Sequence, residues 1–538
     1  MDIIANRPLA IAASHPLLTA ALSFLCMACP LQVFAGSGAA PVTSFSGVPT
    51  ITVAPPGVHG FPFASSALNL AADGFTETEY DFSGTAQAYI NTAHLGASGE
   101  WHVAPNPGVR AAYTSRLLVR SPSDPRRFNG TVIVEWFNDS AGFDTNTDWE
   151  YIHDELLTQG YAWVGVTAQY VGAIALQAWE AGEPGDRYAS INHPGDSFSY
   201  DIFTQAGRAL IEPPAGGPQP LGALTGNIKA VLAVGYSQSG STMFTYVNAI
   251  QPLAKVYNGF IVHSAGVGQP LSISTASFAN SSLPAPPGVP PTPDINVPVS
   301  SIRTDQPAPI LGLDDEFTNI YLYEGVTLHN EPDNAKFRLW EIAGMTHFDP
   351  IIAGYPDLLK TYPDTAPPFE GCTIPPPNTG VPGSYAERAA VHALNQWVVL
   401  GIVPTSAPRF ILREFPVGGY TMIYRDPSTN IALGGIRLPP VAAPIATLTG
   451  YRPEGADVTC GPAVGAYDPW DGDTDPWDGQ PGLDPSPTPE PVLSTLYPTH
   501  ADYVNQVSAS AAAAVASGFM LPADAAIAIA QAKASSVP

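Results

Sequence analysis

The feature that most constrains the fold is a repeated alternation of short apolar strands with amphipathic helical segments. Runs rich in β-branched residues, typical of strands, occur at 113–119, 130–136, 161–166, 230–234, 260–262, 297–302 and 337–342. Helical periodicity occurs at 148–159, 172–183, 200–211, 240–254 and 385–401. Strands separated by helices of this length form a parallel sheet. The sequence therefore predicts an α/β fold, with a mostly parallel sheet flanked by helices.

Size and charge restrict the partners of this chain. Its 538 residues, 45% of them hydrophobic, are enough for one large α/β domain with insertions. The formal net charge of −26 repels nucleic acids and anionic membrane surfaces. We therefore expect a small, uncharged substrate and no nucleic-acid partner.

The N-terminus has the pattern of a signal peptide. An apolar stretch runs from Leu17 to Phe34, and Val33-Phe34-Ala35 resembles a cleavage site before Gly36. A membrane anchor is the alternative, but Pro30 and Gln32 interrupt the stretch. We expect residues 1–35 to be removed, the mature chain to have no membrane span, and the protein to be secreted or periplasmic.

Cysteine usage follows from this prediction. Of four cysteines, two lie in the expected signal peptide, which leaves Cys372 and Cys460. In an exported chain these two would most simply form one disulfide, whereas without export they would be free thiols. The mature part shows no cysteine or histidine spacing typical of a metal site.

Three further regions complete the expected organisation of the chain. The catalytic domain is expected over 36–465, and its proline-rich insertion at 267–298 is equally compatible with a lid and with a long surface loop. The segment 466–492 carries Asp-Pro-Trp-Asp-Gly twice, from Asp468 and from Asp475. Calcium binding is one interpretation, but proline breaks the usual ligand spacing, which favours an acidic low-complexity loop. Residues 493–538 are predicted to form a helical segment that packs on the domain.

A candidate nucleophile lies between a predicted strand and a predicted helix. The strand at 230–234 leads into Gly235-Tyr236-Ser237-Gln238-Ser239-Gly240. A tight turn here would project the Ser237 hydroxyl above the sheet and direct the next backbone N–H toward a developing oxyanion. Ser239 stands where a second glycine is usual, and it is the rival nucleophile. A plain glycine- and serine-rich turn is the alternative interpretation.

The general base should follow a late strand, in the chain order serine, acid, histidine. His347 lies in the loop after the strand at 337–342 and fits this order. His263 precedes any available acid and is interpreted as a core residue or a residue that supports the site. His329 lies in a loop and is expected to be solvated.

The acid and the oxyanion donors are predicted from strand ends. Asp305 follows the predicted strand at 297–302 and would orient the imidazole. The nearby Asp314, Asp315 and Glu316 form a rival cluster, for which a solvated loop is the favoured interpretation. The backbone N–H of Gln238 is one expected oxyanion donor. The loop after Trp136 would supply a second donor, from Asn138 or Asp139, although this loop also fits a plain connection.

These segments resemble a bacterial family called "alpha/beta hydrolase domain" proteins, which includes phthalyl amidase-like enzymes. The resemblance runs through most of the mature chain and is carried by the segments 129–138, 160–166, 193–203, 235–240, 340–347, 371–372, 434–439 and 518–522. It implies an α/β-hydrolase fold and a hydrolase with serine, acid and histidine, and it supports a Cys372–Cys460 pairing. The family usually has a Thr-acid-x-Asp stretch where this chain has 303–307. This departure weakens the assignment of Asp305 as the catalytic acid.

The expected reaction is acyl transfer to water from a carboxylic ester, with no metal and no organic cofactor required. An amide substrate is the alternative within hydrolases, since only the leaving group differs. A non-catalytic binding protein that keeps the fold is the alternative from another class.

Overall fold

A computed structural model provides the structure of the chain. It describes residues 47–91, 103–181, 183, 185–213, 216–265, 307–321, 329–349, 356–362, 378, 380–414, 421–450, 465–470 and 489–538. The expected signal peptide, the insertion at 267–298, Asp305, Cys372 and Cys460 lie outside the described residues.

The described core is a nine-stranded sheet in the order β1-β2-β3-β5-β4-β6-β7-β8-β9. From β5 to β9 all neighbouring strands are parallel, whereas β1, β2 and β3 pair antiparallel at one edge. The mostly parallel sheet expected from the sequence is therefore present. The strands are β1 Thr50–Val53, β2 Phe75–Asn91, β3 Val103–Pro122, β4 Thr131–Trp136, β5 Ala162–Val166, β6 Ala230–Tyr236, β7 Gly259–His263, β8 Ile310–Asp314 and β9 Phe337–Glu341.

Two further pairs of strands lie outside this sheet. They are β10 Leu412–Glu414 with β11 Thr421–Ile423, and β12 Ala446–Thr449 with β13 Ala466–Pro469. The strand β13 covers the start of the segment that we expected to be an acidic loop, and Trp470, next to it, is buried. Residues 466–469 are therefore a strand and not part of a loop.

Helices cover both faces of the sheet, because alternate residues of the buried strands point to opposite sides. Val132 and Val134 of β4 belong to one apolar cluster with α3, and Ile133 belongs to another with α1 and α9. The helices are α1 Thr147–Gln159, α2 Tyr170–Trp179, α3 Ser199–Ile211, α4 Gln238–Thr245, α5 Gln251–Ala254, α6 Glu316–Tyr321, α8 Pro356–Thr361, α9 Gly383–Leu400, α10 Pro439–Ala442, α11 Leu493–Leu496, α12 His500–Ser517 and α13 Pro522–Ala534. A π-helical segment, Tyr246–Ile250, joins α4 to α5.

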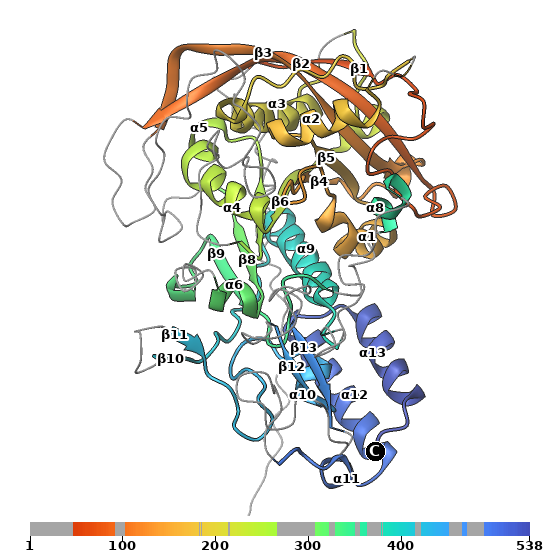
Figure 1. Ribbon diagram of the computed structural model, residues 1–538, viewed down its shortest axis with the longest axis vertical. Helices are drawn as coiled ribbons and strands as arrows, with labels where there is room; N and C mark the ends of the chain where they lie inside the picture. The colour runs from red at the N-terminus through yellow and green to blue at the C-terminus, as the bar shows by residue number, and fades with distance from the viewer. Residues whose placement is uncertain are drawn as a thin grey trace, which may run out of the picture. The chain divides into compact units, whose positions relative to one another are not determined.

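The two longest strands are an element that the sequence patterns showed only in part. Strands β2 and β3 pair along most of their length as the long ribbon seen in Figure 1. Only 113–119 was predicted as a strand there. Leu117 and Val119 of β3 contribute to the core, but polar residues such as Glu79 and Arg116 are also buried in the ribbon, so its pattern of apolar residues is interrupted.

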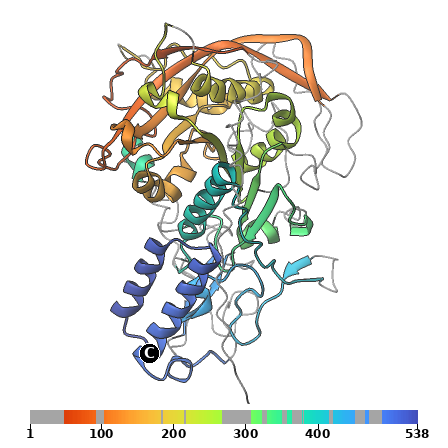
Figure 2. The same cartoon turned by 180° about the vertical axis from the view of Figure 1, so that it is seen from behind.

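The C-terminal segment forms a helical pair. The helices α12 and α13 pack side by side (Figure 2). Gly518, with a φ of 78°, ends α12, and Pro522 begins α13. The segment joins the main core, because Ala511, Ala514 and Phe519 belong to the same apolar cluster as α1 and α9. The two helices therefore pack against the same apolar cluster as α1 and α9.

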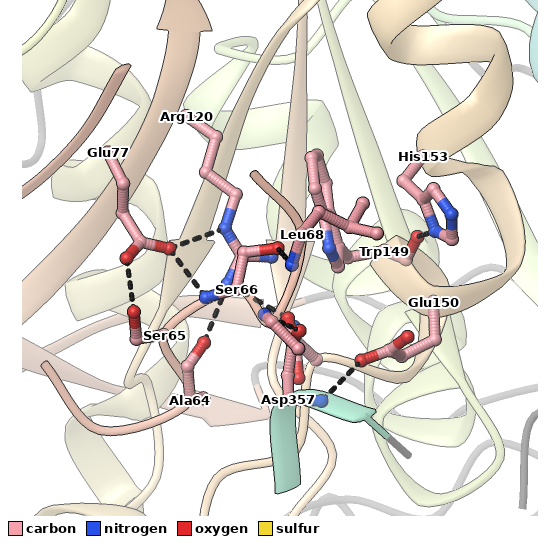
Figure 3. A network of polar contacts seen from close by, with 12 residues as sticks. Ala64, Ser65, Ser66, Leu68, Glu77, Arg120, Trp149, Glu150, His153 and Asp357 are labelled. Carbon is pink, nitrogen blue, oxygen red and sulfur yellow. Dashed lines mark hydrogen bonds and ion pairs between the residues drawn. The ribbon is translucent and has the colours of Figure 1, made fainter. Parts of the chain in front are cut away.

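A buried arginine connects the N-terminal segment to the sheet and to α8 (Figure 3). The side chain of Arg120, on β3, is fully buried and forms ion pairs with Glu77 at 2.8 Å and Asp357 at 3.1 Å. It also donates a hydrogen bond to the backbone oxygen of Ala64 at 2.6 Å. A buried charge needs such partners to offset its desolvation, so this network fixes three distant segments together.

Among the residues that the structure describes, no helix is long and apolar enough to cross a membrane.

Candidate active site

The candidate site is formed where neighbouring parallel strands end at the same edge of the sheet. Strand β6 ends at Tyr236, β8 ends at Asp314 and β9 ends at Glu341. The three strands are labelled in Figure 1. Loops at the carboxyl ends of parallel strands are where open α/β sheets place their sites. Ser237, Asp315 and His347 all lie in these loops.

Ser237 occupies a strained turn between β6 and α4. Its φ of 54° and ψ of −113° are unusual for a residue with a side chain. The backbone is fixed on both sides, since Ser237 N–H donates to His263 O at 2.9 Å and Ser241 N–H donates to Ser237 O at 2.8 Å. The turn therefore holds the Ser237 side chain in one direction.

The turn is tight enough to restrict its flanking residues. A Cβ atom on Gly235 would lie 2.7 Å from Ser239 O, and one on Gly240 would lie 2.7 Å from His263 O. The Ser239 hydroxyl is fully buried; it donates to Tyr236 O at 3.0 Å and accepts from Tyr236 N–H at 3.1 Å. Ser239 is thus part of the turn itself, and the exposed hydroxyl is that of Ser237.

His347 lies within hydrogen-bond distance of this hydroxyl. Ser237 Oγ and His347 Nε2 are 2.8 Å apart. The imidazole is nearly buried and stacks on the Tyr236 ring at a centroid distance of 5.1 Å. The Tyr236 hydroxyl donates to the backbone oxygen of His347. The residue before the serine therefore positions the histidine at both its ring and its backbone.

The carboxylate on the other side of His347 is that of Asp315, not of Asp305. Asp315 Oδ2 lies 2.9 Å from His347 Nδ1. Asp315 directly follows β8, Ile310–Asp314, which pairs with β9. The carboxylate at His347 therefore belongs to a member of the rival cluster, whereas Asp305 and the strand predicted at 297–302 lie outside the described residues.

Asp315 is held in an ionised form by its surroundings. Burial alone would raise the pKa of Asp315, but the charge and hydrogen bond of His347, the Ser264 hydroxyl and the Thr318 backbone lower it below its usual value. Thr318 N–H donates to Asp315 Oδ1 at 2.6 Å, and the Thr318 hydroxyl donates to Oδ2 at 2.9 Å. These donors stabilise the ionised carboxylate, which can then accept a hydrogen bond from the imidazole and stabilise the imidazolium cation.

The expected oxyanion donors separate into two groups. Asn138 N–H donates to Thr145 O at 3.1 Å and its side chain donates to Tyr236 O at 2.7 Å. The Asn138 side chain therefore holds the end of β6, and its backbone N–H is already used. Of the two residues expected as the second oxyanion donor, Asn138 is thus wrong and Asp139 remains.

The remaining candidates lie beside Ser237. Gln238 begins α4, so its backbone N–H has no acceptor within the helix. Asp139 N–H points to the side-chain oxygen of Gln238 at a distance of 3.3 Å. A substrate oxygen that displaced this weak contact could accept from both backbone groups. Burial, with Asp144 and Asp196 nearby, raises the pKa of the Asp139 carboxyl well above its usual value.

The other two histidines are placed as supporting residues. His263 is fully buried at the end of β7, as the sequence interpretation expected. His329 is not a solvated loop residue, since its Nδ1 lies 2.8 Å from Glu341 Oε1 and its side chain is 13% exposed.

Sequence reasoning missed Thr318, Ser264 and the role of Tyr236. A signal for the acid was present, because Ile310-Leu311-Gly312-Leu313 is a short apolar run that follows Pro309 and leads directly into Asp314 and Asp315. No pattern identified Thr318 or Ser264, because their hydrogen bonds depend on the folded arrangement of separate loops.

The comparison with known families agrees with this architecture. The model of the family described as "Alpha/beta hydrolase domain" matches residues 47–530. The chain belongs to this family. The match covers every segment that forms the site, and it agrees with the family resemblance found from the sequence.

Solved structures give more distant likenesses. A variant of the esterase rPPE is 15% identical, with 55% of this chain and 80% of that chain covered and a TM-score of 0.28. The serine hydrolase XC6422 from Xanthomonas campestris, described as lacking a lid, is 11% identical, with 44% of this chain and 80% of that chain covered and a TM-score of 0.26. The esterase Pf2001 from Pyrococcus furiosus is 11% identical, with 54% of this chain and 87% of that chain covered and a TM-score of 0.26. Likenesses this distant say nothing of a substrate. No curated protein matches the chain significantly.

Proposed function

We propose that this member of the alpha/beta hydrolase family is a serine hydrolase that cleaves a carboxylic ester by acyl transfer to water. The observation that carries the proposal is the chain of contacts from Ser237 Oγ through His347 to Asp315, at 2.8 Å and 2.9 Å. A serine in a strained turn, a histidine at its oxygen and an acid behind the histidine are the parts that nucleophilic catalysis requires.

In the proposed reaction, Ser237 Oγ attacks the ester carbonyl while His347 Nε2 accepts its proton. The negative charge that develops on the carbonyl oxygen is stabilised by the backbone N–H groups of Gln238 and Asp139. His347 then donates the proton to the departing alcohol, and Asp315 stabilises the imidazolium during both transfers. In the second half of the reaction, His347 accepts a proton from water as the water attacks the acyl-serine. His347 then returns a proton to Ser237 Oγ, and the carboxylic acid product is released.

Active-site labelling and hydrolysis test this proposal together. The wild-type protein is expected to react with a fluorophosphonate probe and to hydrolyse short aryl esters, and Ser237→Ala should lose both activities. Ser241→Ala, which removes a hydroxyl one turn further along the chain, is the matched control and should keep both. A wild-type protein that is neither labelled nor active on any ester would support a non-catalytic binding protein.

Matched substrates separate an esterase from an amidase. Family resemblance to phthalyl amidase-like enzymes makes an amide the second candidate. Because an alkoxide leaves more readily than an amine anion, we expect a higher kcat/KM for an aryl ester than for the aryl amide of the same acid. Comparable values for the two substrates would favour the amidase.

We also propose that the protein is exported, with cleavage after Ala35 and a disulfide between Cys372 and Cys460. The support is the apolar N-terminal stretch and the two cysteines that remain beyond it. N-terminal sequencing should give Gly36 as the first residue of mature protein, and peptide mapping without reduction should recover the two cysteines in one linked peptide pair. A free thiol at either position would contradict the pairing.

A further inference from the structure

A second group of ionisable side chains lies directly behind the candidate active site. Asp148 of α1, His263 of β7 and Glu387 of α9 are all fully buried. His263 Nδ1 is 3.0 Å from Asp148 Oδ1 and 3.4 Å from Glu387 Oε1. The three side chains each direct one atom to a common point, with these atoms within 4.8 Å of one another.

The hydrogen bonds of this group are incomplete. His263 Nδ1 carries at most one hydrogen, and it faces two carboxylates. Within the part of the chain that the structure describes, Asp148 Oδ2, both carboxylate oxygens of Glu387 and His263 Nε2 have no hydrogen-bond partner. Buried carboxylate oxygens are normally paired, because burial without a partner has a large desolvation cost. A bound cation, or protons held by the acids, would satisfy these oxygens.

The charge of the group is also unbalanced. When both carboxyl groups are ionised, the group carries a charge of about −2 with a neutral imidazole and about −1 with a protonated one, in a fully buried position. A divalent cation with these three ligands would give a neutral assembly. Proteins commonly bind metal ions through such groups because the ion satisfies the charge and the lone pairs together.

We propose that Asp148, His263 and Glu387 form a closed binding site for a divalent transition-metal ion, with Zn²⁺ as the best match. One imidazole nitrogen with carboxylate oxygens suits Zn²⁺, whereas Ca²⁺ and Mg²⁺ prefer oxygen ligands alone. In a tetrahedral site with bonds of about 2.0 Å, ligand atoms are about 3.3 Å apart. The spacings of 3.0 Å and 3.4 Å match this arrangement. A second carboxylate oxygen of Glu387 or Asp148 would supply the remaining contact.

The proposed ion would have a structural role. The site is buried, so it does not reach a substrate. Its histidine is nonetheless linked to the nucleophile, because His263 O accepts the Ser237 N–H and Tyr236 pairs with His263 across β6 and β7. The Tyr236 ring also lies between His263, at 4.7 Å, and His347, at 5.1 Å. An ion that joins α1, β7 and α9 would therefore fix the base of the turn that carries Ser237.

Metal analysis of the purified protein tests this proposal. The protein is produced in medium supplemented with Zn²⁺, dialysed against a mild chelator, and measured by inductively coupled plasma mass spectrometry. We expect about one zinc ion per wild-type chain. X-ray absorption at the zinc edge should show nitrogen and oxygen ligands at about 2.0 Å and no sulfur. A wild-type protein that is folded and active but holds less than about 0.1 zinc per chain would overturn the proposal.

Variants assign the ion to this group of residues. Glu387→Gln keeps the size of the side chain but removes a charged ligand, and we expect the zinc content to fall at least about tenfold. Asp196→Asn is the matched control, since it changes another buried aspartate away from the group, and it should keep the wild-type zinc content. Equal zinc in wild type and Glu387→Gln would place the metal elsewhere and contradict the site.

Two further measurements cover the other outcomes. If Glu387→Gln does not fold, the unfolding temperature of the wild type decides: it should fall when the protein is heated with EDTA and recover with added Zn²⁺. An unfolding temperature unaffected by EDTA, together with zinc-free protein, would indicate a protonated histidine between two acids instead. Ser237→Ala should retain its zinc, so that loss of hydrolysis and loss of metal are distinguished.

Discussion

At the scale of single residues, the site depends on how two adjacent aspartates differ. Asp314 and Asp315 are both fully buried, but only Asp315 contacts His347. Burial, with Glu341 and Asp315 nearby, raises the pKa of Asp314 well above its usual value. Asp315 is ionised, because the charge and hydrogen bonds around it outweigh its burial. Two neighbouring aspartates therefore differ: Asp315 contacts the histidine and has a lowered pKa, whereas Asp314 does not contact it and has a raised pKa.

This difference gives a prediction with an internal control. Asp315→Asn removes the charge that stabilises the imidazolium and permits the wrong tautomer, so kcat for ester hydrolysis should fall by about 1,000-fold or more. Asp314→Asn keeps the shape of a side chain that does not contact His347, and its kcat should stay within about threefold of the wild type. Steady-state kinetics on one aryl ester compares them. Similar losses in both variants would remove the special role of Asp315.

The residues of the site differ in how far the sequence could reveal them. Ser237 lies in a glycine-bounded turn between a strand and a helix, and His347 follows the last strand, so local patterns were sufficient. The acid required the position of β8, and the apolar run before Asp314 is only four residues long. Thr318, Ser264 and Tyr236 act through contacts that form only when separate loops meet. Side chains of this kind have no local sequence signal.

At the scale of single elements, the turn between β6 and α4 is the most restricted segment. A side chain on Gly235 would collide with the backbone of Ser239, which cannot move without displacing the start of α4. The sequence predicted this turn because a tight strand-to-helix turn leaves space only for glycine and small residues beside the serine. It did not predict the length of β2 and β3, since buried charged residues such as Arg116 interrupt the apolar pattern of that ribbon.

We therefore predict that Gly235→Ala damages both stability and activity. The new Cβ would lie 2.7 Å from Ser239 O, so the free energy of unfolding should fall by about 1–3 kcal/mol. Displacement of Ser237 from His347 should also lower kcat/KM. Urea unfolding and ester kinetics measure the two effects.

Gly226→Ala is the control for this change. A Cβ at Gly226 would meet nothing within 4 Å, and its effect should stay within about 0.5 kcal/mol. Equal stability of the two variants would show that the turn tolerates a side chain.

At the scale of the whole described unit, the C-terminal helices are connected to the catalytic core by a buried ion pair. Arg388 of α9 contacts Asp524 of α13 at 2.6 Å and Asp154 of α1 at 3.1 Å. The side chain of Asp524 is 4% exposed, whereas that of Asp154 is 64% exposed. The two acids thus share one arginine in very different surroundings.

Their removal should have unequal effects. Asp524→Asn leaves a buried guanidinium without its main partner, and we expect the free energy of unfolding to fall by about 2 kcal/mol or more. Asp154→Asn removes a solvent-screened contact and should change it by less than about 0.5 kcal/mol. Urea unfolding of both variants is the measurement. A larger effect at Asp154 would mean that burial does not determine the strength of this connection.

The buried acids of this molecule also affect the charge that it carries in solution. The formal value of −26 counts every carboxyl as ionised. Burial raises the pKa of Asp196 to about 6 and that of Asp139 and Asp314 well above the usual value. At these three carboxyls the folded chain therefore holds more protons than the unfolded chain above about pH 4, so these groups stabilise the fold less as the pH rises through their raised pKa values.

Unfolding at pH 7 should consequently release protons into the medium. A pH-indicator dye in weakly buffered urea would record this acidification, and Asp314→Asn should reduce the number of protons released. No change in the dye signal on unfolding would mean that these carboxyls are already ionised in the fold. The folded protein should thus migrate in an electric field as a less acidic molecule than its composition implies.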